Sequence, residues 1–599
     1  MAAMRPRRLA RLLIFVLLIG SATYFTVTYT SLLNRPHFII HTPSDAPPRA
    51  DLYNPGDHPI RKLINGAQAD FDNLVKKRST TLEEAVKEYK RRYSIPPPPH
   101  FDKWWKFAKE RNVVLMDEFD SVHHSLHPFW GLPPVVLRRR VAEACGHDNG
   151  LIGLQIRHGN VSHIEGGRIW MRAALKGMME GFVNELPDMD LAFNIHDEPR
   201  VVLQHEDLAE LNKRADVAKG GLQRVARLRH GWSNTPNDLT EGQGFKDSPI
   251  TRFSSLPHQS TWQHSRSSCP PDSPARSLSE LNKIADYNIT SIVSPLGFMS
   301  NHTASSDICL HPSLATTYGF FAGANTFRFT TDLVPIFSQS KLSSFQDIIY
   351  PSPWYWADKV PYIPEEDMKT WEEKESQVYW RGATTGGYSR FGNWRRQHRQ
   401  RFVSFMNSNS ANPIKTLKKV EGEDEWKVDT TKQIKHFKDS FDVRFVEVGQ
   451  ADAGDVAAQK DMFRLVPKGK PGEVFAWKYL LDMDGNAFSG RFYSFLRSKS
   501  AVVKMAVSRE WHDEWLKPWL HYIPVSVQGV DWIETIRWYL DGTEGGGKST
   551  MEGKKVADRG MEWSNKVLRN EDLEVWFFRL LLEYARVVDD DRESIGFEL

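Results

Sequence analysis

An uncharged, mostly apolar segment spans residues 12–33 and directly follows four arginines. About 20 apolar residues cross the hydrocarbon core of a bilayer, and clustered arginines stay on its cytoplasmic side. We therefore expect a cytoplasmic tail (residues 1–11), a transmembrane signal-anchor (residues 12–33) and a lumenal body. The small residues Ser21 and Ala22 leave a cleaved signal peptide as the alternative. In both cases the body folds in the secretory pathway.

The body has the composition of a large enzyme tethered to a membrane. With 599 residues and 40% hydrophobic content, the chain is long enough for two or three buried cores. The 78 basic residues nearly balance the 75 acidic ones, so no overall field favours nucleic acid as a partner. We expect a single-pass type II protein of the Golgi or endoplasmic reticulum membrane.

Cysteines and glycosylation triplets fit a lumenal body. Three cysteines are too few for a disulfide framework and lack the spacing of zinc ligands. In an oxidising lumen we pair Cys269 with Cys309, which flank the same irregular region, and leave Cys145 free. Asn-X-Ser/Thr triplets are acceptors for N-glycosylation. The expected glycosylation sites are Asn160, Asn288 and Asn301.

Changes in composition divide the body into regions. Proline clusters around one charged helical stretch, Leu82–Tyr93, predict a stem over residues 34–99. Apolar stretches that alternate with helical patterns predict an α/β domain over residues 100–344 and a second one over residues 345–599. Residues 203–282 are polar, and we expect a surface insertion there with little regular structure.

The clearest strand, helix, strand unit lies in the second domain. Trp477–Met483 is predicted as a buried strand, Ser489 as the N-cap of a helix over residues 490–497, and Ala501–Met505 as the next strand. Such units build parallel sheets that bind ligands at the strand ends, where a helix N-terminus attracts phosphate. Arg491 lies in the first turn, where the helix dipole disfavours a cation unless an anion is present. An arginine paired with a surface carboxylate is the alternative.

An ordered series of motifs resembles glycosyltransferase family 90. The motifs are Tyr-Trp-Arg-Gly-Ala-Thr (379–384), Lys-Tyr-Leu-Leu-Asp (478–482), Ser-Gly-Arg-Phe (489–492) and His-Tyr-Ile-Pro (521–524). The family includes Rumi-like protein O-glucosyltransferases and fungal capsule-associated xylosyltransferases. Segments 98–102, 117–120 and 186–200 resemble the longer fungal branch. The resemblance covers roughly residues 96–590 without the polar insertion.

This resemblance implies an α/β fold of the GT-B type, with two Rossmann-like domains that face a cleft. It also implies inverting transfer of a sugar from a UDP-sugar donor to a glycan or glycoprotein acceptor, with no essential metal. Xylose is the preferred sugar because of the fungal resemblance, and glucose is the second choice. A lumenal glycan-binding or scaffold protein that has lost turnover is the alternative from another class.

Inverting transfer requires a base that removes a proton from the acceptor hydroxyl. Asp197 is the candidate, because it follows the apolar run 191–195 and matches the position of the base in Rumi-like members of the family. In one alternative, Asp197 or Glu198 caps a helix or pairs with Arg200. In another, His196 is the base.

The departing UDP gains negative charge, which fixed cations and backbone donors stabilise. The resemblance points to Arg381 and Arg491, whose guanidinium groups match the geometry of phosphate oxygens. Gly382 in the glycine-rich turn 382–387 would let the backbone approach the diphosphate, and Ser489 would donate a hydrogen bond.

Three other patterns compete with this assignment. Residues 542–549 match a P-loop, but the helix expected before them replaces the strand that a P-loop needs, so we assign them to a surface loop. Asp482 and Asp484 have the acidic spacing that binds a divalent cation in other transferases, which leaves a Mn²⁺-dependent mechanism open. The basic run 395–401 lacks the aromatic residues of a nucleic-acid site, and we expect a solvated helix face with one or two members near the donor.

Overall fold

The structure is a computed structural model that describes residues 56–599 except 226, 278–291, 294–295, 471 and 542–547. The expected cytoplasmic tail and signal-anchor, the first part of the stem and the Asn288 triplet lie outside the described residues. Among the residues that are described, no helix is both long and apolar enough to cross a membrane.

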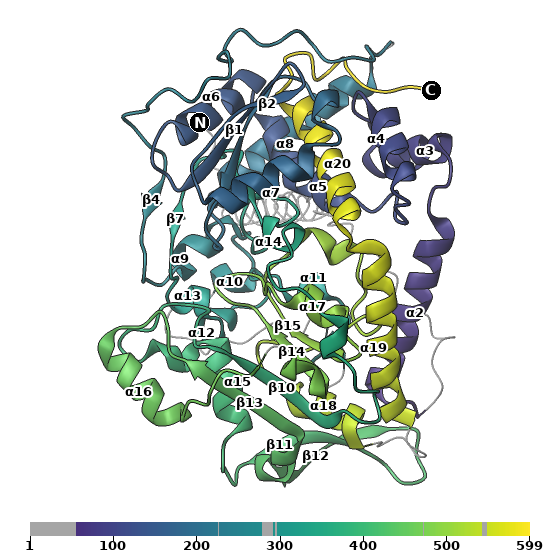
Figure 1. Cartoon of the computed structure of the whole chain (residues 1–599), viewed down its shortest axis with the longest axis vertical. Coiled ribbons are helices and arrows are strands. Elements are labelled where there is room, and N and C mark those ends of the chain that lie inside the picture. Colours follow the sequence, from purple (N-terminus) through teal and green to yellow (C-terminus); the bar gives the residue numbers. More distant parts are fainter. Residues whose placement is uncertain (1–55, 226, 278–291, 294–295, 471, 542–547) are drawn as a thin grey trace, which may run out of the picture. The chain divides into compact units, whose positions relative to one another are not determined.

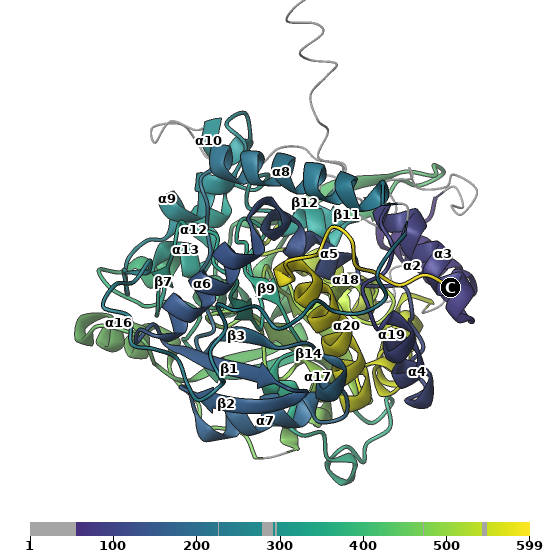
Figure 2. The same ribbon diagram turned by 90° about the horizontal axis from the view of Figure 1, so that it is seen from above.

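The first sheet has five strands in the order β2-β1-β3-β8-β9. The strands are β1 (Leu151–Arg157), β2 (Asn160–Glu165), β3 (Met189–Asn194), β8 (Phe337–Ser338) and β9 (Ile348–Ile349). β1 runs antiparallel to both β2 and β3, whereas β3, β8 and β9 are parallel. Every residue of β1 and β3 is buried, and Figure 2 shows β3, β1 and β2 side by side.

This mixed sheet differs from the expected Rossmann-like first domain, although the α/β class is confirmed. The cause is the tight turn between β1 and β2. His158 and Gly159 both have positive φ, at 50° and 72°, as in the two-residue turns that reverse a chain within a sheet. α7 (Ile169–Met179) then packs along β2 and leads toward β3.

The second sheet is wholly parallel, in the order β13-β10-β14-β15-β16. It consists of β10 (Glu375–Ala383), β13 (Phe441–Glu447), β14 (Trp477–Met483), β15 (Ala501–Met505) and β16 (Ile523–Pro524). β14 and β15 have the predicted bounds. From β10 the chain builds β13 on one side and then β14 on the other, so the order reverses between β10 and β14. In parallel α/β sheets, ligands bind beyond the carboxyl ends of the strands at such a switch point.

Two helices near this switch point are shorter than expected. The helix predicted over residues 490–497 is α17 (Phe492–Leu496). It starts late because the Ser489 and Gly490 carbonyls accept hydrogen bonds from Tyr355 Oη (2.8 Å) and Trp354 Nε1 (3.3 Å). The helix expected over the basic run 395–401 is split between η6 (Asn393–Arg396) and α15 (His398–Met406), because residue 397 has extended backbone angles.

The C-terminal helices connect the two halves of the fold. α18 (Trp532–Asp541), predicted as a helix, and α19 (Lys548–Val567) flank the P-loop-like segment, most of which lies outside the described residues. α20 (Asn570–Val588) returns to the first sheet and packs against α7 and α4 (Phe101–Glu110) (Figure 1). α20 is buried on all its faces, as expected for a helix enclosed by other elements. The last helix of the expected second domain thus packs on elements of the first.

The other described elements connect or cover these layers. The longer ones are α2 (Pro59–Lys77), α3 (Leu82–Tyr93), α5 (Asp120–Leu126), η2 (His127–Gly131), α6 (Pro134–Cys145), α8 (His205–Gln223), β11 (Pro413–Lys419), β12 (Trp426–Gln433), η7 (Ile434–Ser440) and α16 (Ala453–Phe463). The shorter ones are η3 (Val183–Glu185), β4 (Ser254–Ser255), α9 (Trp262–Ser265), η4 (Arg266–Ser268), α10 (Pro274–Ser277), β5 (Ile292–Val293), β6 (Phe298–Met299), α11 (His302–Ser305), α12 (Leu314–Thr317), α13 (Gly319–Ala322), β7 (Arg328–Phe329), α14 (Pro353–Trp356), η5 (Pro364–Glu366), η8 (Glu473–Ala476) and η9 (Trp511–Glu514).

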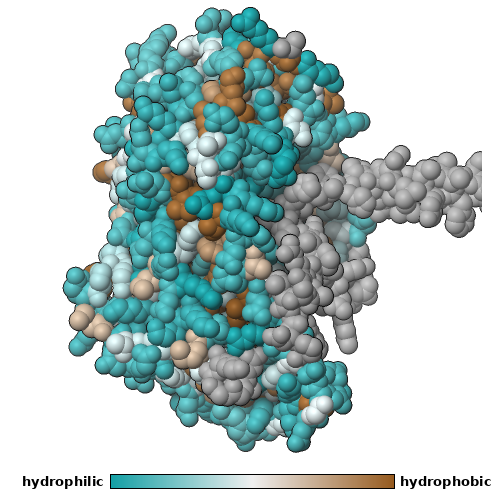
Figure 3. All heavy atoms as spheres, turned by 90° about the vertical axis from the view of Figure 1, so that its right-hand side faces the viewer, coloured by the Kyte–Doolittle hydropathy of each residue, from teal (hydrophilic) through white to brown (hydrophobic). Residues whose placement is uncertain are grey.

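The described part of the expected stem belongs to the folded unit. α3 has the predicted bounds, and α2 precedes it with Ile60 and Ile64 buried. His58 Nε2 lies 3.1 Å from Glu534 Oε1 of α18, and both side chains are fully buried. Hydrophilic side chains cover most of the face that includes α2 and α19, with hydrophobic ones in small separate groups (Figure 3). The segment after residue 56 is therefore packed structure and not a free spacer.

The polar insertion contains more regular structure than expected. α8 is a helix of 19 residues, and Leu211, Ala215 and Leu222 are buried on one of its faces. α8 packs against η2, which explains why a largely polar sequence still forms a helix here. The remainder of the insertion has only short elements.

Cys269 and Cys309 form a disulfide with Cα atoms 5.3 Å apart, as predicted, and Cys145 is free. Of the described glycosylation triplets, Asn160 is exposed at the start of β2. The Asn301 side chain caps α11 by accepting a hydrogen bond from the Ala304 N–H at 3.1 Å. The two asparagines therefore differ in how readily a transferase would reach them.

We predict that removing the disulfide destabilises the protein. The cysteines are 40 residues apart, and a cross-link of that span stabilises a fold by about 3–4 kcal/mol through the entropy of the unfolded chain. The Cys269→Ser, Cys309→Ser double variant should unfold at a lower urea concentration, as followed by tryptophan fluorescence. Cys145→Ser is the matched control and should unfold close to the wild type; equal losses in both proteins would contradict this prediction.

Candidate active site

Asp197 lies in the loop after β3, at the end of the apolar run that predicted its position. Its side chain reaches solvent, unlike that of the buried Glu198. Surrounding protein nevertheless removes part of its hydration and raises the pKa of Asp197, while a hydrogen bond from the Asn486 side chain and the charge of Arg168 lower it. Asp197 therefore meets both solvent and neighbouring polar groups.

The contact with Asn486 joins the two halves of the fold. Asn486 belongs to the turn that follows β14, and Asp197 follows β3, so both lie beyond the carboxyl end of a strand. This turn leads directly into Ser489 and Arg491. The candidate base and the candidate donor loop are thus brought to one place by tertiary structure.

The structural alternatives for Asp197 are not observed. α8 begins at His205 with Gln204 as its N-cap, so Asp197 caps no helix there. The Arg200 guanidinium instead donates to the carbonyls of Asn149 (2.6 Å), Gly150 (3.2 Å) and Arg328 (2.9 Å). Arg200 therefore supports the backbone beneath the loop and does not pair with Asp197.

Glu198 and His196 both differ from Asp197 in their surroundings. Glu198 Oε1 accepts a hydrogen bond from the Thr326 N–H (2.8 Å), and burial together with the charge of Asp197 raises the pKa of Glu198 to about 8. His196 Nε2 faces Gly150, is buried and has no hydrogen-bond partner among the described residues. Burial, followed by nearby arginines, lowers the pKa of His196 to about 4. The imidazole is thus neutral near pH 7, with its Nε2 directed into the protein.

We predict that Glu198 makes the stability of the protein depend on pH. Its pKa in the folded state, about 8, exceeds the ordinary 4.5, so the folded state holds the proton more tightly than the unfolded chain. The resulting stabilisation is present at low pH and is lost as the pH rises through about 8. Glu198→Gln should keep the bond to Thr326 without this loss.

The measurement is urea unfolding of both proteins at pH 5, 7 and 9. The free energy of unfolding of Glu198→Gln should rise relative to the wild type by an amount on the order of 4 kcal/mol over this range. Glu206→Gln, at an exposed glutamate on α8, is the control and should show no such trend. A difference from the wild type that stays constant with pH would rule out this assignment.

On the donor side, Arg491 lies at the switch point between β10 and β14. One of its guanidinium N–H groups donates to the carbonyl of Arg381 on β10 (2.7 Å), and the group lies 5.9 Å from the Trp380 ring. Burial lowers the pKa of Arg491, and the charge of Asp482 opposes this shift. Within the described ranges Arg491 has no carboxylate within salt-bridge distance, so the surface ion pair considered as an alternative is not observed.

Arg399 is the residue that sequence reasoning missed. It is buried on α15, and its guanidinium donates to the carbonyls of Ala383 (3.2 Å), Met483 (3.1 Å) and Asp484 (2.8 Å) at the ends of β10 and β14. Burial and the charge of Arg491 lower the pKa of Arg399 to about 10. Arg399 and Arg491 thus repel each other at the ends of β10 and β14. A diphosphate bound there would offset this repulsion.

The basic run 395–401 contained the signal for Arg399. Arg395 and Arg396 are exposed, but residues 397–400 are buried, so the expectation of a solvated helix face was wrong for these four. The expectation that one or two of its members lie near the donor site fits the position of Arg399. Charge alone did not identify Arg399, because four of the seven residues in this run are arginines.

The side chain of Arg381 is directed away from the switch point. Its guanidinium pairs with the Asp442 carboxylate (2.8 Å) and donates to the Asp442 carbonyl (2.9 Å). Asp442 lies opposite Tyr379 in the parallel register, toward the amino end of the sheet. The Arg381 side chain therefore lies outside the candidate site. Its backbone carbonyl, which accepts a hydrogen bond from Arg491, belongs to the site.

The predicted glycine and serine positions are closely packed against other protein groups. A Cβ on Gly382 would stand 2.4 Å from the Trp380 ring, and one on Gly387 would stand 2.7 Å from the Gly319 carbonyl oxygen. Ser489 is buried, with its carbonyl bound by Tyr355. Their absent or small side chains thus serve internal packing, and their role toward a donor stays a prediction.

The Asp482 and Asp484 carboxylates both interact with other groups of the protein. The Asp484 carboxylate accepts hydrogen bonds from Tyr318 Oη (2.9 Å) and from the backbone N–H groups of residues 507 and 508 (2.8 and 3.0 Å). Asp482 is buried with Lys504 Nζ at 3.5 Å. Asp484 therefore holds the loop after β15 in place. Elsewhere in the described part of the chain, no group of three or more acidic, histidine or cysteine side chains is arranged to hold a metal.

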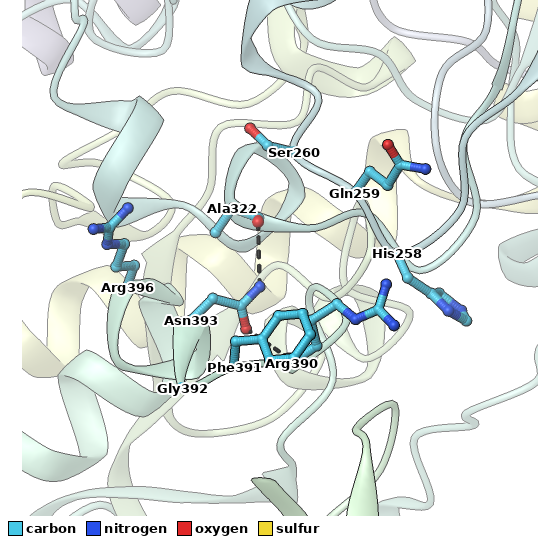
Figure 4. A pocket seen from close by; sticks show the side chains of 9 residues that line it. All are labelled: His258, Gln259, Ser260, Ala322, Arg390, Phe391, Gly392, Asn393 and Arg396. Atoms are coloured by element: carbon cyan, nitrogen blue, oxygen red, sulfur yellow. Dashed lines mark hydrogen bonds between the residues drawn. The ribbon is translucent and has the colours of Figure 1, made fainter. Parts of the chain in front are cut away.

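A hollow of about 470 Å³ lies beside the loop after β10 (Figure 4). It is lined by His258, Gln259, Ser260, Ala322, Arg390, Phe391, Gly392, Asn393 and Arg396. Figure 4 shows the Asn393 side chain directed toward Ala322, whose carbonyl accepts its hydrogen bond at 3.2 Å. The lining combines the polar insertion with the second half of the fold, and it includes none of the predicted site residues.

Comparison with known families identifies the class of the second half. Residues 323–593 match the sequence model described as Glycosyl transferase family 90. This part of the chain is a glycosyltransferase family 90 domain, as its motifs indicated. It contains Arg381, Arg399, Ser489 and Arg491, whereas Asp197 precedes it.

Individual relatives point to the Rumi-like members of that family. The chain is 23% identical over 286 residues to "O-glucosyltransferase rumi homolog" of Aedes aegypti, covering 43% of this chain and 56% of the relative. It is 25% identical over 278 residues to "Protein O-glucosyltransferase 1" of Homo sapiens, covering 42% and 57%. A shorter match, 29% over 129 residues, is to "Protein O-glucosyltransferase 2" of Danio rerio, covering 21% and 24%. The chain thus spans less than two thirds of the length of each relative.

Proposed function

We propose that this chain transfers a sugar from a UDP-sugar to a hydroxyl of a glycan or glycoprotein acceptor, with inversion at the anomeric carbon. The observation that carries the proposal is the position of Asp197 near the loop that carries Arg491. The Asn486 side chain of that loop lowers the pKa of Asp197, and Trp354, which packs against Trp170 of α7, donates to the Gly490 carbonyl beside Arg491. Two α/β halves, with the loop after β3 close to the loop after β14, support an arrangement of the GT-B type.

In the proposed reaction, Asp197 removes the proton of the acceptor hydroxyl as its oxygen attacks the anomeric carbon. The bond between that carbon and the diphosphate oxygen breaks, and UDP leaves with the electron pair. Arg491 and Arg399 offset the negative charge that develops on the diphosphate. A neutral Glu198 next to Asp197 keeps a second negative charge away from the base.

Two donor sugars are proposed. The names of the relatives favour UDP-glucose, and the motifs that resemble the fungal branch favour UDP-xylose. The two sugars differ by one hydroxymethyl group, so the shape of the pocket decides between them and not a sequence motif. We further propose that no metal is essential, since the Asp482 and Asp484 side chains are engaged within the protein.

We also propose that the body is lumenal and that residues 12–33 anchor it to the Golgi or endoplasmic reticulum membrane. The disulfide between Cys269 and Cys309 supports a lumenal body, because disulfides form and persist in oxidising compartments. The composition and charge balance of the chain support no nucleic-acid partner.

We predict that Asp197→Asn abolishes transfer without weakening donor binding. Loss of a general base lowers the turnover number by about 100-fold or more. The measurement is acceptor-stimulated UDP release with UDP-glucose and UDP-xylose, with and without EDTA, alongside the dissociation constant for UDP from calorimetry. Asp148→Asn, at an exposed aspartate near the same loop, is the control and should remain active.

Several results would change this proposal. Full activity in Asp197→Asn would remove Asp197 from the mechanism, and activity lost only in EDTA would restore a metal. UDP binding without turnover on any acceptor would favour a glycan-binding protein that has kept the fold and lost catalysis.

We predict that Arg491→Lys and Arg399→Lys each weaken UDP binding. A lysine keeps the charge but cannot reproduce two parallel guanidinium hydrogen bonds, and hydrogen bonds to charged groups contribute about 1.5–3 kcal/mol. The dissociation constant for UDP should rise by about 10-fold or more in each variant. Arg395→Lys, in the same basic run but exposed, should bind UDP like the wild type. Unchanged affinity in both buried variants would place the diphosphate elsewhere.

A further inference from the structure

A short rim, residues 166–170, leads from β2 into the first turn of α7; residues 166–169 are exposed and Trp170 is half-buried. Gly166 and Gly167 have positive φ, at 79° and 57°, and a Cβ on Gly166 would stand 2.1 Å from the Leu151 carbonyl oxygen. The two glycines therefore bend the chain tightly against β1. The next residues are left on the surface: Arg168 is exposed and the Ile169 side chain is 77% exposed. An exposed aliphatic side chain indicates a binding site when neighbouring apolar residues form a patch with it.

This rim adjoins the loop of the candidate base. A Cβ on Gly167 would stand 3.1 Å from the Ile195 side chain, two residues before Asp197. The charge of Arg168 also reaches Asp197, since it lowers the pKa of that carboxyl. The rim therefore lies within reach of a molecule that presents a hydroxyl to Asp197.

The rim also adjoins the donor loop through two tryptophans. The Trp170 ring lies 5.9 Å from the Trp354 ring in a nearly perpendicular contact. Trp354 Nε1 donates to the carbonyl of Gly490 (3.3 Å), the residue before Arg491. Lys359 Nζ lies 4.4 Å from the centre of the Trp170 ring. Aromatic surface and exposed cations thus lie between the base and the diphosphate site.

We propose that Arg168, Ile169, Trp170 and Trp354 form the acceptor subsite and bind the sugar ring whose hydroxyl is to be glycosylated. This inference rests on the proposed function. Indole rings and the Ile169 side chain offer an apolar surface for the C–H face of a sugar, and Arg168 offers N–H donors to its oxygens.

The size of the rim favours a sugar ring over a folded protein surface. A stable protein interface buries about 800 Å² on each partner and involves about 20 or more residues. The rim consists of five consecutive residues with one tryptophan behind them, which matches a ligand of one or two rings. Specificity for the acceptor would then depend on this segment, independently of the donor site.

Ile169→Ser tests the proposal with little risk to the fold, because the side chain is exposed, and Trp170→Ala removes the ring. The probe is a panel of neutral oligosaccharides that end in glucose, mannose, galactose or xylose. In each variant the KM for the best oligosaccharide should rise about 10-fold or more, a loss of about 1.4 kcal/mol in acceptor affinity. In Ile169→Ser the KM for the UDP-sugar and the UDP release in the absence of acceptor should not change. Val217→Ser, at another exposed aliphatic residue, is the control.

A binding measurement separates failure of this proposal from failure of the proposed function. Saturation-transfer NMR of the same oligosaccharides on Asp197→Asn, with and without Ile169→Ser, reports binding even when no transfer occurs. Loss of binding in the double variant supports the subsite. Unchanged KM and binding in the rim variants, or no oligosaccharide binding at all, would overturn it. Loss of transfer to a folded glycoprotein, with transfer to free oligosaccharide intact, would also overturn it in favour of a protein-binding rim.

Discussion

The buried guanidinium of Arg399 is the interaction on which the candidate donor site depends. A buried charge is costly unless hydrogen bonds replace its hydration. Arg399 finds those bonds at the carbonyls that end β10 and β14, and so it ties the two strands together at the point where the sheet order reverses. The turn after β14 begins at the carbonyls that Arg399 binds. The positions of Asn486 and Arg491, which follow in this turn, therefore depend on Arg399.

The base loop has an equivalent support in the first half of the fold. The Arg200 and Val201 N–H groups donate to the buried carboxylate of Asp347 at 2.8–3.0 Å, and the Arg200 guanidinium holds three backbone carbonyls. Of residues 196–200, Asp197 alone is exposed. A rigid support below an accessible carboxylate suits a base that must meet a mobile acceptor.

The two halves are not independent, because α20 leaves the second sheet and packs among the helices of the first. The distance between the base loop and the donor loop is therefore set partly by α20. The family match, which extends to residue 593, includes this helix.

Local pattern in the sequence determined the α/β class, the bounds of β14, β15 and α3, the disulfide and the family motifs, because each depends on residues close together in the chain or on a few distinctive residue types. Tertiary structure alone decided the rest. The sequence places Arg381 in a family motif and Arg399 in a basic run, yet only the fold directs Arg381 to Asp442 and Arg399 to the strand ends. The pairing of β1 with β3 and the approach of Asn486 to Asp197 likewise depend on partners far away in the chain, which periodicity and propensity do not encode.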